Sequence, residues 1–78
     1  MGNEELLQRI VVAPDVAGGK PVIRGTRVYV AIILDSLASG MTPEQVIDHY
    51  PQLAPEDIRA ALAYGALLAH ENTFQVAV

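Results

Sequence analysis

The sequence contains no cysteine and no tryptophan, and it has one phenylalanine among its 78 residues. The absence of cysteine excludes a disulfide framework and any metal site built on thiolates. Long apolar runs are also missing, because the longest, residues 28–34, is far shorter than the ~18 residues that a membrane span requires. No basic stretch followed by an apolar one marks a secretory leader. We therefore expect a single cytoplasmic domain over residues 1–78.

Positive charge is scarce, since five Lys and Arg residues face nine Asp and Glu residues. The net charge of −4 argues against non-specific nucleic-acid binding as the main task. Residues 16–34 nevertheless contain no acid, and their basic side chains are Lys20, Arg24 and Arg27. Arginine binds carboxylates and phosphates in a bidentate manner, so this basic patch is the candidate partner-binding site. The alternative is that the patch only solvates a turn, or that one of its members pairs with Asp15 or Asp35.

Hydrophobic residues, by contrast, are plentiful at 51% of the chain. This fraction is ample for a core and somewhat high for a domain of this size. The surplus indicates that part of the apolar surface is buried in an oligomer.

Residues 9–30 are predicted to form an extended N-terminal arm. Three short extended segments are expected, at residues 9–13, 22–23 and 28–30. Turns rich in glycine separate them at 18–21 and 24–27. Because strands this short do not support themselves, the arm should lie on the rest of the domain.

Residues 30–71 predict a core of three helices. The first runs from residue 30 and stops before Gly40, a residue typical of the position just after a helix. The second covers about 43–49, with Thr42 as its cap and a glutamine at the capping-box position. The third covers about 55–71, with proline in its first position. The fold class expected is therefore mostly α, with a short β-type arm.

The third helix is apolar nearly all round, which indicates burial on more than one side. Its expected core face is Ile58, Ala61, Leu62, Gly65, Leu68 and Ala69. The second apolar side predicts a homodimer interface formed by Ala63, Tyr64, Ala66 and Leu67. The tail, residues 72–78, alternates weakly between apolar and polar residues, a pattern typical of an edge strand.

The second and third helices, joined by a short turn, look like a helix-turn-helix. Candidate DNA contacts are Arg59 and Gln52, because a recognition helix presents such side chains from its first turn. The same turn carries Glu56 and Asp57, which would repel phosphates. Direct readout of DNA by this helix is therefore not favoured.

The string Gly-Gly-Lys-Pro-x-Ile-x-Gly-Thr-Arg at residues 18–27, followed by Tyr-Pro-Gln-Leu at 50–53, is very similar to a known pattern. It resembles the family catalogued as domain of unknown function 433, and the similarity extends over about residues 9–70. That family resembles prokaryotic antitoxins of the VapB type. The resemblance implies a helix-turn-helix-like fold and a toxin partner of the nuclease type with an acidic active site.

Together these features predict an antitoxin-like regulator of a toxin–antitoxin pair, whose basic patch binds an acidic toxin, with operator DNA as a second candidate ligand. The alternative is a protein-interaction or scaffold dimer that binds no nucleic acid. An enzyme is not expected, because His49 and His70 have no ligand at metal-site spacing on their helices and no serine has an evident base. Neither a metal nor a cofactor is expected.

Overall fold

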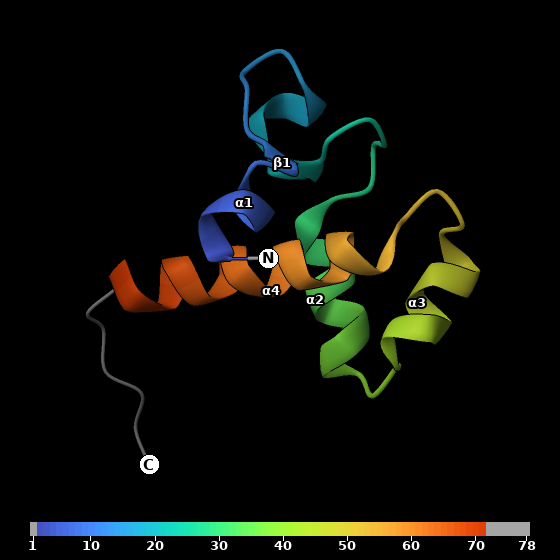
Figure 1. Ribbon diagram of the computed structural model, residues 1–78. Coiled ribbons are helices and arrows are strands. Elements are labelled where there is room, and N and C mark those ends of the chain that lie inside the picture. The colour runs from blue at the N-terminus through green and yellow to red at the C-terminus, as the bar shows by residue number, and fades with distance from the viewer. Residues whose placement is uncertain (1, 72–78) are drawn as a thin grey trace.

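The computed structural model of the chain describes residues 2–71 (Figure 1). Within these residues the fold is mostly helical, with four helices and one two-stranded antiparallel sheet. The elements follow the order α1 (Asn3–Leu7), β1 (Ile10–Val11), the 3-10 turn η1 (Ala17–Gly19), β2 (Val22–Ile23), α2 (Val30–Ala38), α3 (Pro43–His49) and α4 (Pro55–Glu71). None of these helices is long and apolar enough to cross a membrane.

The three helices expected from the sequence are confirmed, and their ends are fixed by the residues that predicted them. The Thr42 hydroxyl accepts a hydrogen bond from the Gln45 N–H at 3.2 Å, and the Gln45 side chain accepts one from the Thr42 N–H at 2.8 Å. This reciprocal capping box satisfies two donors that the start of α3 would leave free. After α2, the chain turns at Gly40, whose φ of +103° is readily adopted only by glycine.

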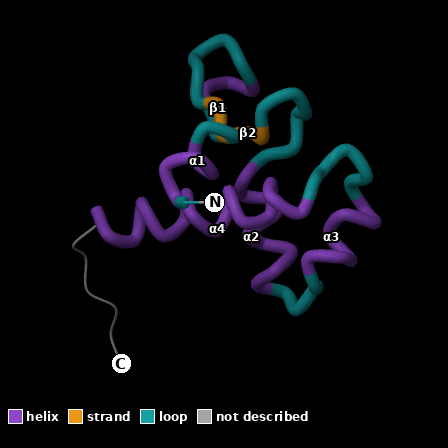
Figure 2. The backbone as a smooth tube through the Cα atoms, in the orientation of Figure 1, coloured by secondary structure: helices purple, strands orange, loops and turns teal. Residues whose placement is uncertain are grey.

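The prediction of three helices was wrong in number, because α1 is a fourth. This helix of five residues lies against α4, as Figures 1 and 2 show. Leu6 from α1 forms a small apolar cluster with Ala60 and Ala63 of α4, and all three side chains are buried. A helix this short is not stable alone, so its docking on α4 maintains it.

The main core lies between the hairpin, which comprises β1, β2, their connection and the turn after β2 (residues 10–29), and helices α2, α3 and α4. Its buried members are Ile23, Val28, Val30, Ile33, Val46, Leu53, Ile58 and Ala61. Ile47 of α3 and Tyr50, which directly follows this helix, pack against the cluster. The arm contributes Ile23 and Val28 to the core, so it lies on the helices as predicted.

The predicted core face of α4 is only partly correct. Ile58 and Ala61 are buried, but Leu62 is 49% exposed and Leu68 is 40% exposed. Ala69 is exposed too, whereas Ala60 was placed outside the core face and is fully buried. The reason is that α1 covers a second side of the helix, while the C-terminal end of α4 extends past the other helices (Figure 2).

β1 is shorter than the extended segment predicted at residues 9–13, whereas β2 covers residues 22–23 as predicted. β1 and β2 pair in antiparallel register, with Ile10 opposite Ile23 and Val11 opposite Val22. The predicted third extended segment, residues 28–30, contributes a single bridge between Tyr29 and Val22. The expected edge strand in the tail lies outside the described residues.

Candidate functional site

The two arginines of the basic patch flank one tight turn after β2. The Ile23 carbonyl accepts hydrogen bonds from both the N–H and the hydroxyl of Thr26, at 3.1 and 2.8 Å. The Thr26 hydroxyl oxygen in turn accepts one from the Val28 N–H at 3.0 Å. Gly25 has a φ of +79°, which this turn requires and a side chain would oppose. The turn therefore closes on itself and leaves the side chains of Arg24 and Arg27 exposed.

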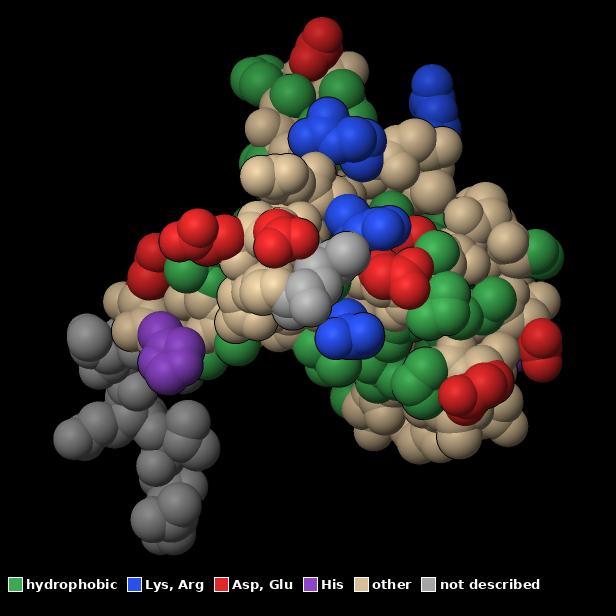
Figure 3. Space-filling model, in the orientation of Figure 1, with side chains coloured by type: hydrophobic (Ala, Val, Ile, Leu, Met, Phe, Trp, Pro, Cys, Tyr) green, Lys and Arg blue, Asp and Glu red, His purple; other side chains and the backbone are tan. Residues whose placement is uncertain are grey.

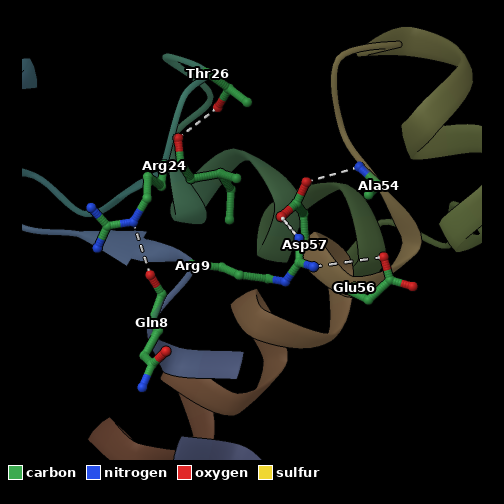
Figure 4. A network of polar contacts seen from close by, with 8 residues as sticks. Gln8, Arg9, Arg24, Thr26, Ala54, Glu56 and Asp57 are labelled. Carbon is green, nitrogen blue, oxygen red and sulfur yellow. Dashed lines mark hydrogen bonds and ion pairs between the residues drawn. The ribbon is translucent and has the colours of Figure 1, made fainter. Parts of the chain in front are cut away.

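The guanidinium of Arg24 is held in place by the N-terminal segment. Its Nε–H donates to the Gln8 carbonyl at 3.0 Å, and its backbone N–H donates to the Arg9 carbonyl at 2.7 Å. In Figure 4 the terminal nitrogens of Arg24 point away from Gln8 and from the side chain of Arg9. Within residues 2–71, no hydrogen bond or ion pair engages these Nη groups or the side chain of Arg27.

An open groove of about 520 Å³ lies beside this turn. Arg24 and Arg27 line it together with apolar side chains, of which the largest are those of Tyr29, Ile23, Val11, Val16 and Val22. Asp15 is the single acid in this lining. Figure 3 shows Lys and Arg side chains together with a carboxylate at the hairpin end of the molecule, and both carboxylates and basic side chains over the helices.

Lys20 lies next to the groove without lining it. Its ammonium is 5.8 Å from the centre of the Tyr29 ring, within the range of a cation–π contact. The same ring lines the groove, so the fold brings all three members of the basic patch to one end of the molecule. The alternative, in which a member of this patch pairs with Asp15 or Asp35, is not found among residues 2–71, where the ion pairs all belong to Arg9.

Arg9 is a charged residue near the site whose contacts the sequence did not reveal. One of its Nη groups lies 3.0 Å from Oδ1 of Asp57, and the other lies 3.9 Å from the Glu56 carboxylate. The second oxygen of Asp57 accepts a hydrogen bond from the Ala54 N–H at 2.8 Å (Figure 4). Asp57 thus caps α4 and also ties it to the strand segment, at a side chain that is only 8% exposed.

The candidate DNA contacts Gln52 and Arg59 are both exposed. The two acids expected to repel phosphates are Glu56 and Asp57, and both are paired with Arg9.

The predicted dimer interface needs one correction. Ala63 is buried beneath α1 of its own chain, so it is not available to a partner. Tyr64 is half-buried against the main core. Ala66 and Leu67 are exposed, as an interface in the free chain requires.

The histidines lie at exposed positions, His49 ending α3 and His70 in the last turn of α4. No cluster of three or more potential metal ligands occurs in the part of the chain that the structure describes.

Comparison with known proteins shows that a family model matches the segment of the chain that contains the hairpin. The family model described as protein of unknown function (DUF433) matches residues 10–65, a segment that runs from β1 into α4. An uncharacterized protein of Sinorhizobium fredii, y4eO, is 44% identical to the chain over 52 residues, which is 67% of this chain and 24% of that protein. No solved structure matches the chain. Because the family model covers most of its length, the chain belongs to the DUF433 family of proteins of unknown function.

Proposed function

We propose that the protein is an antitoxin-like regulator that binds an acidic surface of a partner protein through its basic hairpin. The observation that carries this proposal is the turn in which Arg24 and Arg27 expose guanidinium groups that form no ion pair within residues 2–71, although the chain as a whole has a net charge of −4. Exposed arginines held beside an apolar groove are suited to carboxylate recognition. The resemblance to VapB-type antitoxins supports a nuclease toxin with an acidic active site as the partner.

The test is co-purification of the chain with the product of its adjacent gene, before and after nuclease treatment. We expect a stoichiometric complex that persists after nuclease treatment. The double variant Arg24→Glu/Arg27→Glu should lose this complex, because two attractive contacts become repulsive. Truncating one partner of a desolvated charge pair costs ~2–5 kcal/mol, or at least about thirtyfold in affinity.

The control is Arg59→Glu, which makes the same kind of charge reversal at a single exposed position on α4. It should retain the complex, and all variants should keep the helical far-UV circular dichroism signal. Survival of the complex in the double variant, or its loss in Arg59→Glu alone, would contradict the proposal.

A second candidate function is operator binding through a helix-turn-helix formed by α3 and α4. What favours it is that Arg9 pairs with Glu56 and Asp57, which reduces the negative charge beside the exposed Arg59. In the same experiment, a complex that disappears on nuclease treatment would assign the association to nucleic acid. A protein that is recovered alone and free of DNA would favour the interaction or scaffold dimer instead.

We further propose a homodimer formed through the C-terminal part of α4. Its support is the group of exposed leucines there: Leu62 at 49%, Leu67 at 38% and Leu68 at 40%. Size exclusion with light scattering should give twice the chain mass of 8.4 kDa. Leu67→Glu/Leu68→Glu should give the monomer mass, whereas Val12→Glu, at an exposed position on the hairpin side, should not. A wild-type monomer at micromolar concentration would refute the dimer.

A further inference from the structure

The groove beside the turn at residues 24–27 has the features of a specific binding site for one kind of peptide. Its volume of about 520 Å³ falls within the usual range of ligand pockets, ~300–1,000 Å³. Its lining combines two basic side chains with a largely apolar wall. A ligand that fits both parts carries a negative group close to an apolar one.

Arg24 supplies the most defined contact point. Because its Nε–H is bonded to the Gln8 carbonyl, the guanidinium is oriented before any ligand arrives. The two Nη groups remain as an end-on fork, which matches the two oxygens of one carboxylate. Orienting the side chain in advance lowers the entropy lost on binding. Arg27 lies at the other end of the same turn and adds a second positive charge to the lining.

The rest of the lining selects between ligands. Val11, Val16 and Tyr29 form a wall that a bare anion would leave uncovered, so an apolar side chain next to the carboxylate completes the fit. Asp15, in the same lining, and the net charge of −4 repel any anionic ligand. Their effect is larger for a continuous polyanion such as a phosphate backbone than for a segment that places one carboxylate on Arg24.

We infer that this groove binds an extended acidic segment of another protein. One carboxylate of the segment lies on the Nη groups of Arg24, and a neighbouring apolar side chain lies against the wall formed by Val11, Val16 and Tyr29. This inference rests on the proposed function, from which it takes that this chain supplies the basic side of the contact and a partner protein the acidic side. The chemistry of the ligand is specified independently of any toxin. The ligand class is a peptide in which aspartate or glutamate stands beside a large aliphatic residue.

The experiment is an amide chemical-shift titration of the isotope-labelled full chain with capped synthetic hexapeptides. In the first peptide aspartate alternates with leucine, in the second asparagine replaces aspartate, and in the third serine replaces leucine. We expect saturable shifts at Val16, Gly25 and Thr26 with the first peptide and much weaker ones with the other two. Equal binding of the asparagine peptide would overturn the carboxylate contact, and equal binding of the serine peptide would overturn the apolar contact.

The variant Arg24→Gln removes the charge while keeping an amide that can donate to the Gln8 carbonyl. It should weaken the first peptide at least about tenfold, since a hydrogen bond to a charged group contributes ~1.5–3 kcal/mol. Asp48→Asn, which changes one charge at an exposed position of α3 away from the groove, is the control and should bind as the wild type does. A single-stranded oligonucleotide that shifts the same amides as strongly as the first peptide would overturn the assignment to a protein segment.

Failure of this inference is distinguishable from failure of the proposed function. Peptide binding that depends on Arg24, without a complex with the adjacent gene product, would support the peptide-binding groove and refute the antitoxin role. A complex with that product and no saturable peptide shifts would support the toxin partner and refute the peptide-binding groove.

Discussion

Replacing Asp57 with alanine is expected to lower the free energy of unfolding by about 2–3 kcal/mol. The carboxylate is buried, pairs with Arg9 at 3.0 Å and accepts the Ala54 N–H at 2.8 Å, so the substitution leaves a cation and a helix N-terminal donor without a partner. The estimate stays below the ~3–5 kcal/mol typical of fully buried pairs, because the Arg9 side chain is 35% exposed and water screens it. Urea denaturation followed by far-UV circular dichroism measures the change.

Two further variants separate the contributions at this position. Asp57→Asn keeps an acceptor for the Ala54 N–H and removes the charge, so it should cost less than the alanine variant. Glu56→Ala removes a carboxylate that is 3.9 Å from Arg9 and more exposed, and should cost about 0.5 kcal/mol or less. If Glu56→Ala and Asp57→Ala destabilise the protein equally, the role assigned to Asp57 is wrong.

The largest expected effect of an apolar substitution is at Ile33, whose side chain is fully buried in the main core. Ile33→Ala should cost about 3–4 kcal/mol through lost burial and the cavity left behind. A domain of this size has a total stability of ~4–12 kcal/mol, so the variant loses a large share of it. The melting temperature should fall by about 12 °C or more, as measured by thermal denaturation.

Ile33→Val, which removes one methylene group, should cost about 1 kcal/mol and remains measurable if the alanine variant does not fold. Val12→Ala, on a side chain that is 55% exposed, should cost about 0.5 kcal/mol or less. Similar costs for Val12→Ala and Ile33→Ala would contradict the position of the core.

The helices that the sequence predicted are those with local end signals. Thr42 and Gln45 mark the start of α3 through contacts only three residues apart, so a linear pattern contains the whole motif. α1 has no such motif, and its five residues are too few to show a helical period. Its stability depends on contacts with Ala60 and Ala63, which are far from residues 3–7 in the sequence, so no local pattern marks this helix.

The candidate site was predictable to the same extent. The acid-free stretch around Arg24 and Arg27 identified the basic patch, because a charge pattern is visible in the chain itself. The partner of Arg9 lies 48 residues away, and only the docking of the N-terminal segment on α4 selects Asp57 over the other acids. The same docking places the Gln8 carbonyl beside Arg24, so the orientation of the Arg24 guanidinium could not be predicted from the sequence either.

The packing of α1 on α4 has a consequence for the nascent chain. Leu6 leaves the ribosome well before Ala60 and Ala63, and at ~5–20 residues per second the delay is about 3 to 11 seconds. The main core waits for the same helix, since it includes Ile58 and Ala61. Cooperative folding therefore starts only after most of α4 has been translated, and until then the ribosome holds a chain whose hydrophobic segments are available to chaperones.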